Sequence, residues 1–159
     1  MTKWMIISAT MLLPTCALAQ APQVEKNVSA SMSQAIMSAA IDECAKTNFR
    51  VSVVIVDKAG QLAAAVRGDG TAPHTVEFAR MKAYTARTRN QTSLEFAAAA
   101  ASGDGALLRQ IPGVVAIGGG VPIKVGDETI GAVGVSGAPG GDKDEVCVRA
   151  GLAKIAGKY

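Results

Sequence analysis

The sequence predicts an α+β fold, in which helices cover an antiparallel β-sheet. Two observations predict it. Strand-like segments come in groups of two and then three, and short turns join the members of each group. Helix-like segments stand before, between and after these groups. Strands that follow one another through short turns pair antiparallel, whereas a parallel sheet needs a long crossover after each strand.

The first predicted helix begins near Ser31 or Ser33, either of which could cap it. Its apolar residues recur every four positions and so form one stripe: Met32, Ile36, Ala40 and Cys44. Residues 49–56 (FRVSVVIV) then form a β-branched run typical of a buried strand. A turn at 57–60 ends in glycine, and 61–67 follow as a second strand, so the pair predicts a hairpin.

Two helices are expected in the middle of the chain. The first spans 75–88 after a glycine- and proline-containing loop, and its inner face would consist of Val76, Ala79, Ala83 and Ala86. Thr92 or Ser93 would cap a shorter, alanine-rich helix that ends near Ala101.

Three more strands are predicted at 114–117, 121–125 and 129–135, which brings the antiparallel sheet to five strands. The closing helix would run over 142–156. It begins with three acidic residues, which suit the positive end of a helix dipole: Asp142, Asp144 and Glu145.

The first nineteen residues predict a cleavable signal peptide. Lys3 is their only charged residue, the apolar run 4–13 follows it, and Ala17-Leu18-Ala19 provides the small residues that signal peptidase admits. A run of about ten residues is too short for a bilayer, which needs roughly twenty. We expect cleavage after Ala19, one mature domain at 20–159 without a membrane span, and a periplasmic or secreted location.

Charge and cysteine content narrow the function. The formal net charge is only +3 and the basic residues are dispersed, so nucleic acid is not an expected partner.

Cys44 and Cys147 survive cleavage. In an oxidising compartment they are candidates for a disulfide, and the alternative is two buried free thiols. If the first and last helices pack antiparallel on one sheet face, the two cysteines meet. With a single histidine, they do not make a zinc site.

Neither the glycine-rich stretch nor the serines predict an active site. Gly118-Gly119-Gly120 lies between strands late in the chain, whereas a dinucleotide-binding loop follows the first strand of a βαβ unit. Ser136 in GVSGA does not match the nucleophile elbow, and no set of nucleophile, base and oxyanion donor can be named. The sequence therefore favours a protein that is not an enzyme.

Three segments in this order carry a family resemblance: VSVVIVDKAGQL at 51–62, RMKAYTART at 80–88, and GGGVPIKVGDETIGAVGVSGAPGGDKDE at 118–145. Together they resemble the GlcG/HbpS family, which also occurs as the C-terminal part of some corrinoid adenosyltransferases. The resemblance implies a profilin-like fold with a five-stranded antiparallel sheet, a homo-oligomer, and binding of haem or another tetrapyrrole. The chain departs from the family at 87–92 (RTRNQT), where an aromatic-glycine pair is usual.

The resemblance directs attention to the helix at 75–88 and the loop before it. His74, the only histidine, would be an axial ligand of haem iron, because imidazole is a common iron ligand. A solvated loop residue is the alternative. Further candidates for haem binding are a phenol that could ligate iron, cations that could hold propionates, and a neighbouring threonine: Tyr84, Lys82, Arg87, Arg89 and Thr85. Helical periodicity prevents Lys82, Tyr84 and Arg87 from sharing one face.

The resulting hypothesis is an exported haem- or tetrapyrrole-binding protein that acts as a carrier, scavenger or sensor module. Two alternatives remain at this point. One is a small enzyme or accessory protein in the catabolism of organic acids or aldehydes, with which genes of this family are associated. The other is an assembly protein whose only role is as an oligomeric scaffold.

Overall fold

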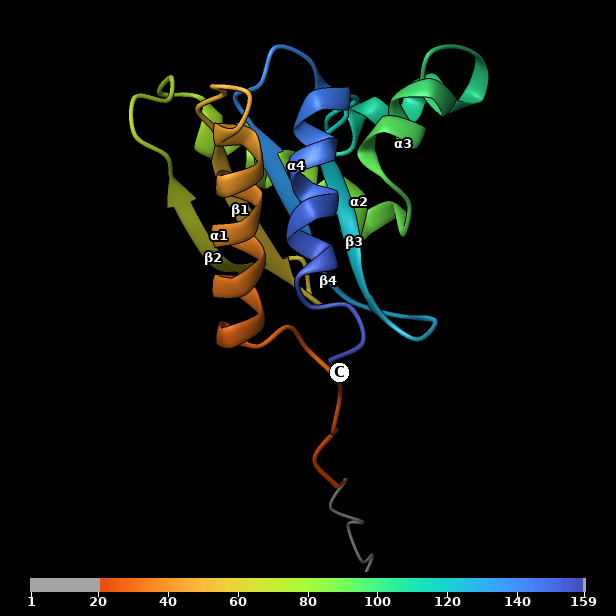
Figure 1. Cartoon of the computed structure of the whole chain (residues 1–159). Coiled ribbons are helices and arrows are strands. Elements are labelled where there is room, and N and C mark those ends of the chain that lie inside the picture. Colours follow the sequence, from red (N-terminus) through yellow and green to blue (C-terminus); the bar gives the residue numbers. More distant parts are fainter. Residues whose placement is uncertain (1–20, 159) are drawn as a thin grey trace, which may run out of the picture.

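The computed structural model describes residues 21–158, so the predicted signal peptide at 1–19 lies outside the described part of the chain. The elements follow the predicted order with two differences: a 3₁₀ helix stands where a loop was expected, and the strand predicted at 114–117 is absent (Figure 1). They are α1 (Ala30–Ala45), β1 (Ser52–Asp57), β2 (Leu62–Arg67), α2 (Thr75–Arg89), α3 (Ser93–Ala99), the 3₁₀ helix η1 (Gly103–Gln110), β3 (Gly120–Val125), β4 (Glu128–Ser136) and α4 (Gly141–Ala153). No helix within 21–158 combines the length and the apolar character needed to cross a membrane.

The α+β class and the antiparallel sheet are confirmed. The strand order is β2-β1-β4-β3, and every neighbouring pair is antiparallel. Helices α1 and α4 lie side by side on one face of the sheet, and α2 covers the other (Figure 1). Central strand β1 is buried on both faces, which explains its unbroken apolar run: Val53 and Ile55 belong to the core under α1 and α4, and Val56 packs with the alanines of α2.

Helix α2 lies unusually close to the sheet because its inner face carries small residues and β4 carries a glycine beneath it. A Cβ atom at Gly134 would lie 2.0 Å from the carbonyl oxygen of Ala79. Only glycine permits this approach of backbone to backbone. The close packing sets the height of α2 above the end of β4, where the cavity described below is found.

The sheet has four strands and not the predicted five. Residues 114–117 have no regular secondary structure and form no ladder with a neighbouring strand. Instead the backbone N–H of Val115 donates to Oγ1 of Thr85 on α2 over 2.9 Å. The single proton of that hydroxyl is shared between the carbonyl of Met81, at 2.8 Å, and the carbonyl of Val115, at 3.3 Å. A β-branched run predicts extended backbone, but a helix side chain satisfies these groups in place of a strand.

Replacing Thr85 with valine is expected to lower the free energy of unfolding by about 1–3 kcal/mol, the usual cost of leaving a buried backbone group without its partner. Thr85 is fully buried, and the isosteric change keeps its volume. Urea titration followed by circular dichroism would measure the loss. Thr88→Val makes the same change on the exposed side of α2 and serves as the control. Equal midpoints for the two variants would contradict this role of Thr85.

The helix ends differ slightly from expectation. Ser29, and not Ser31 or Ser33, caps α1, since its hydroxyl accepts the N–H of Met32. Thr92 caps α3 in a reciprocal capping box with Glu95, as one of the two predicted caps.

The predicted disulfide is present. Cys44 lies in the last turn of α1 and Cys147 in the middle of α4, their Cα atoms are 5.5 Å apart, and their sulfurs are bonded. The two helices run antiparallel on one sheet face, as the sequence predicts (Figure 1), but the bond joins the end of α1 to the middle of α4 and not to its N-terminus. The bond joins residues 103 positions apart.

Candidate functional site

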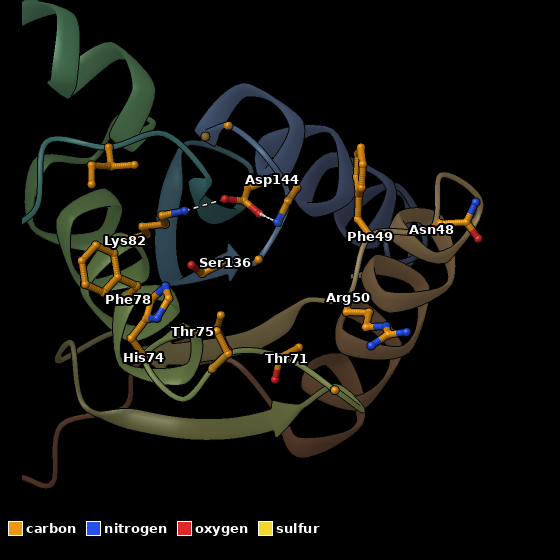
Figure 2. Close-up of a pocket in the computed structure, with 17 residues that line it drawn as sticks. Asn48, Phe49, Arg50, Thr71, His74, Thr75, Phe78, Lys82, Ser136 and Asp144 are labelled. Atoms are coloured by element: carbon orange, nitrogen blue, oxygen red, sulfur yellow. Dashed lines mark hydrogen bonds and ion pairs between the residues drawn. The ribbon is translucent and has the colours of Figure 1, made fainter.

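A cavity of about 520 Å³ opens at the end of the sheet where β4 stops (Figure 2). Its walls come from five segments: residues 48–50 between α1 and β1, residues 70–74 before α2, one side of α2 from its first residue, Ile117 before β3, and residues 136–144 from the end of β4 into α4. The volume lies within the range usual for small-molecule sites, which is roughly 300–1,000 Å³.

A buried ion pair forms one wall. The ammonium of Lys82 lies 2.6 Å from Asp144 Oδ2, and only 3% of each side chain is exposed. Lys82 also donates to the carbonyl of Val135 over 3.1 Å, and Asp144 Oδ1 accepts the N–H of Ala138 over 2.9 Å. The pair thus ties α2, β4 and the start of α4 together at the cavity (Figure 2).

Burial raises the pKa of Asp144 above its ordinary value of 3.8, and the positive charge of Lys82 opposes that rise. A carboxyl whose pKa is raised by folding binds its proton more tightly in the folded state. Its contribution to stability is therefore greatest below pH 3.8 and decreases as the pH rises through the raised pKa. Lys82 limits this loss by stabilising the carboxylate.

His74 stands at the mouth of the cavity. It occupies the N-cap position of α2, makes no capping hydrogen bond, and is exposed. Its imidazole meets the ring of Phe78, one turn further along α2, edge to face, with 5.5 Å between centroids. Both rings line the cavity (Figure 2). The structure therefore brings two of the predicted site residues, His74 and Lys82, into one cavity.

The other four predicted residues do not line this cavity. Thr85 bonds to residue 115 as described. Tyr84 packs beside Gly60 and Gly113, with the apolar cluster around Phe96. Arg87 donates to the carbonyl of Lys58 over 2.6 Å, and Arg89 lies over the ring of Phe96 at 5.9 Å. Their contribution to haem binding stays a prediction.

Several cavity residues were not candidates in the sequence. Asp144 looks like an ordinary acid in the first turn of a helix, and nothing local shows that it meets a lysine 62 positions away. Arg50 and Phe49 fall in the predicted start of a strand, and Phe78 on a helix whose inner face was expected to be small and apolar. Ser136 was considered only as a nucleophile.

Within residues 21–158, no cluster of three or more histidine, cysteine, aspartate or glutamate side chains is arranged to hold a metal ion. A metal could still be held through one protein ligand when a macrocycle supplies the others, as in haem. His74 offers such a ligand at the cavity mouth.

Comparison with known proteins gives consistent matches. The model of the HbpS-like family, described as haem-degrading protein HbpS-like, matches residues 28–153. Protein GlcG of Escherichia coli strain K12 is 34% identical over 109 residues, which are 69% of this chain and 81% of GlcG. A double mutant of HbpS from Streptomyces reticuli has a TM-score of 0.76 at 31% identity over 92% of this chain and 97% of its own. The haem complex of PduOC has a TM-score of 0.74 at 23% identity over 81% and 95%.

Proposed function

The chain belongs to the HbpS-like family of haem-degrading proteins, as its three motifs predict, and from this premise we propose that it binds haem or a related tetrapyrrole. The match over residues 28–153 carries the proposal. The haem complex of PduOC, which shares the fold, supports it. The role would be that of a carrier, scavenger or sensor module.

The residues of the cavity fit a haem group at its outer end. The exposed imidazole of His74 is an iron ligand, and the rings of Phe49 and Phe78 provide apolar surface for a macrocycle. Exposed Arg50 is a cation suited to a propionate. Haem would supply the iron and its redox chemistry; His74 would bind the iron, and Arg50 and the two rings would orient the macrocycle.

The setting of this function is also proposed. The leader at 1–19 supports export to the periplasm or beyond the cell, and the bond between Cys44 and Cys147 agrees with an oxidising compartment. A profilin-like classification and assembly into a homo-oligomer are proposed from the family resemblance.

Haemin titration tests the proposal. The purified protein is expected to shift and sharpen the Soret band until one haemin is bound per binding site. His74→Ala should remove the histidine-ligated spectrum and weaken binding by roughly tenfold or more, because the chain has no second histidine.

Tyr84→Phe is the matched control, since its phenol is the other predicted iron ligand and lies outside the cavity. That variant is expected to bind like the wild type. If Tyr84→Phe and not His74→Ala loses the band, the ligand assignment is wrong although haem binds. If the wild type leaves the haemin spectrum unchanged, the proposed function fails.

A further inference from the structure

The inner end of the cavity contains a buried hydroxyl that the proposed haem site does not use. Ser136, the last residue of β4, is only 5% exposed, lines the cavity, and has no hydrogen-bond partner among residues 21–158. Its oxygen is not among the side-chain atoms that are fully enclosed without a partner, so the hydroxyl opens into the cavity and is free to bond to a ligand there. Figure 2 shows its hydroxyl on the side of the cavity where Lys82 and Asp144 meet.

Besides the hydroxyl of Ser136, one N–H of Lys82 is also unused at the inner end of the cavity. An ammonium carries three N–H groups, and two of them are taken by Asp144 and by the carbonyl of Val135. Both carboxylate oxygens of Asp144 already accept hydrogen bonds, from Lys82 and from Ala138. The inner end therefore offers two free donors, the third N–H of Lys82 and the hydroxyl of Ser136, to a ligand with acceptor oxygens.

The charges around the cavity favour an anion with a single negative charge. Lys82 and Asp144 neutralise one another, whereas Arg50 forms no ion pair among the described residues. The first turn of α4 also borders the cavity, and its N-cap Gly140 makes no side-chain cap. The positive end of this 13-residue helix favours negative charge. A doubly charged phosphate is disfavoured, because Asp144 and its neighbour Asp142 would repel it.

We propose that the inner end of this cavity is a carboxylate-binding subsite, in which the hydroxyl of Ser136 and the free N–H of Lys82 donate to the carboxylate. Two ligands present this chemistry. One is a propionate of the haem proposed for the same cavity, and in that form the inference rests on the proposed function. The other is a free small carboxylic acid, which would bind without haem.

Sodium propionate is the first probe, and thermal unfolding and calorimetric titration are the readouts. The wild type is expected to gain thermal stability saturably with propionate. Sodium chloride and neutral propionamide should not reproduce the gain. Ser136→Ala should weaken propionate binding roughly tenfold, as expected for losing a hydrogen bond to a charged group. Ser102→Ala, an exposed serine outside the cavity, should bind like the wild type.

Haemin and its dimethyl ester separate the two sources. If a haem propionate occupies the subsite, the wild type should bind haemin roughly tenfold more tightly than the ester, and Ser136→Ala should remove that preference. If the ligand is a free acid, haemin and the ester should bind equally while propionate still stabilises the protein.

The failures of the two proposals are distinguishable. Saturable stabilisation by propionate without any response to haemin retains the subsite and rejects haem binding. A Soret shift with equal affinity for haemin and ester, no response to propionate and an unchanged Ser136→Ala variant retains haem binding and overturns the subsite. Propionamide that binds as tightly as propionate also overturns it, since the ligand would not need a charge.

Discussion

Replacing Lys82 with methionine is expected to lower the free energy of unfolding by about 3–5 kcal/mol, the usual effect of leaving one buried charge without its partner. Asp144 would keep its carboxylate in an environment where 3% of the side chain is exposed. The hydrogen bond from Lys82 to the carbonyl of Val135 would be lost as well. Urea unfolding at neutral pH, followed by circular dichroism, would measure the change.

The double variant Lys82→Met/Asp144→Leu separates charge from packing. It removes both charges, so it should recover most of the lost stability, since apolar residues often replace a buried pair at little cost. Arg80→Met is the control on the same helix: its pair with Glu77 is exposed and contributes at most about 1 kcal/mol. If the double variant is as unstable as Lys82→Met, the unpaired carboxylate does not cause the loss in the free energy of unfolding.

The loss in the free energy of unfolding caused by Lys82→Met should also depend on pH. In the wild type, burial raises the pKa of Asp144 and the ammonium of Lys82 lowers it. Without the ammonium, the pKa of Asp144 should therefore rise further above 3.8. The folded variant then gains stability as the pH falls through that raised pKa, because protonation removes the buried charge. Its difference from the wild type should therefore shrink in mildly acidic buffer. A difference that grows as the pH falls would contradict the pairing.

Removing the disulfide is the second change with a large expected effect. Cys44→Ala/Cys147→Ala should lower the free energy of unfolding by about 2–5 kcal/mol, because the bond restricts an unfolded chain across a long loop. The two cysteines are 103 positions apart and both are almost fully buried. Guanidinium unfolding of the oxidised protein and of the variant would measure the difference.

Dithiothreitol provides the control for the disulfide. It should shift the unfolding midpoint of the wild type toward that of the double variant and leave the variant itself unchanged. Equal midpoints for the oxidised wild type and the double variant would show that the bond contributes no stability. The same measurement on protein made in a reducing compartment should match the reduced wild type.

Local patterns were sufficient for most of the elements. The apolar stripe of α1, the β-branched run of β1 and the small inner face of α2 each predict their element, because one periodicity is satisfied over the whole segment. The fifth strand predicted at 114–117 was wrong although its residues favour extended backbone. Residue pattern does not show the bonding partner, and here the position of Thr85 in space decides it.

The candidate site was predicted only where it coincides with a motif. Lys82 is the first residue of the KAYTA segment and His74 precedes the same helix, so the family resemblance identified both as candidates. Tyr84 and Arg87 lie in the same segment, yet they turn toward other neighbours, because a helix distributes successive residues around its axis. Proximity in sequence to a motif does not give a side chain a place in the cavity.

The sequence by itself determined the α+β class, the family and the order of most elements, since these depend on periodicity and motifs, and it left the two cysteines as either a disulfide or two free thiols. The tertiary structure alone decided that Asp144 meets Lys82, that Arg50 and Ser136 share a cavity with His74, and that the sheet stops at four strands. The physical reason is that these are contacts between segments far apart in the chain, which form only when α2, β4 and α4 have packed together.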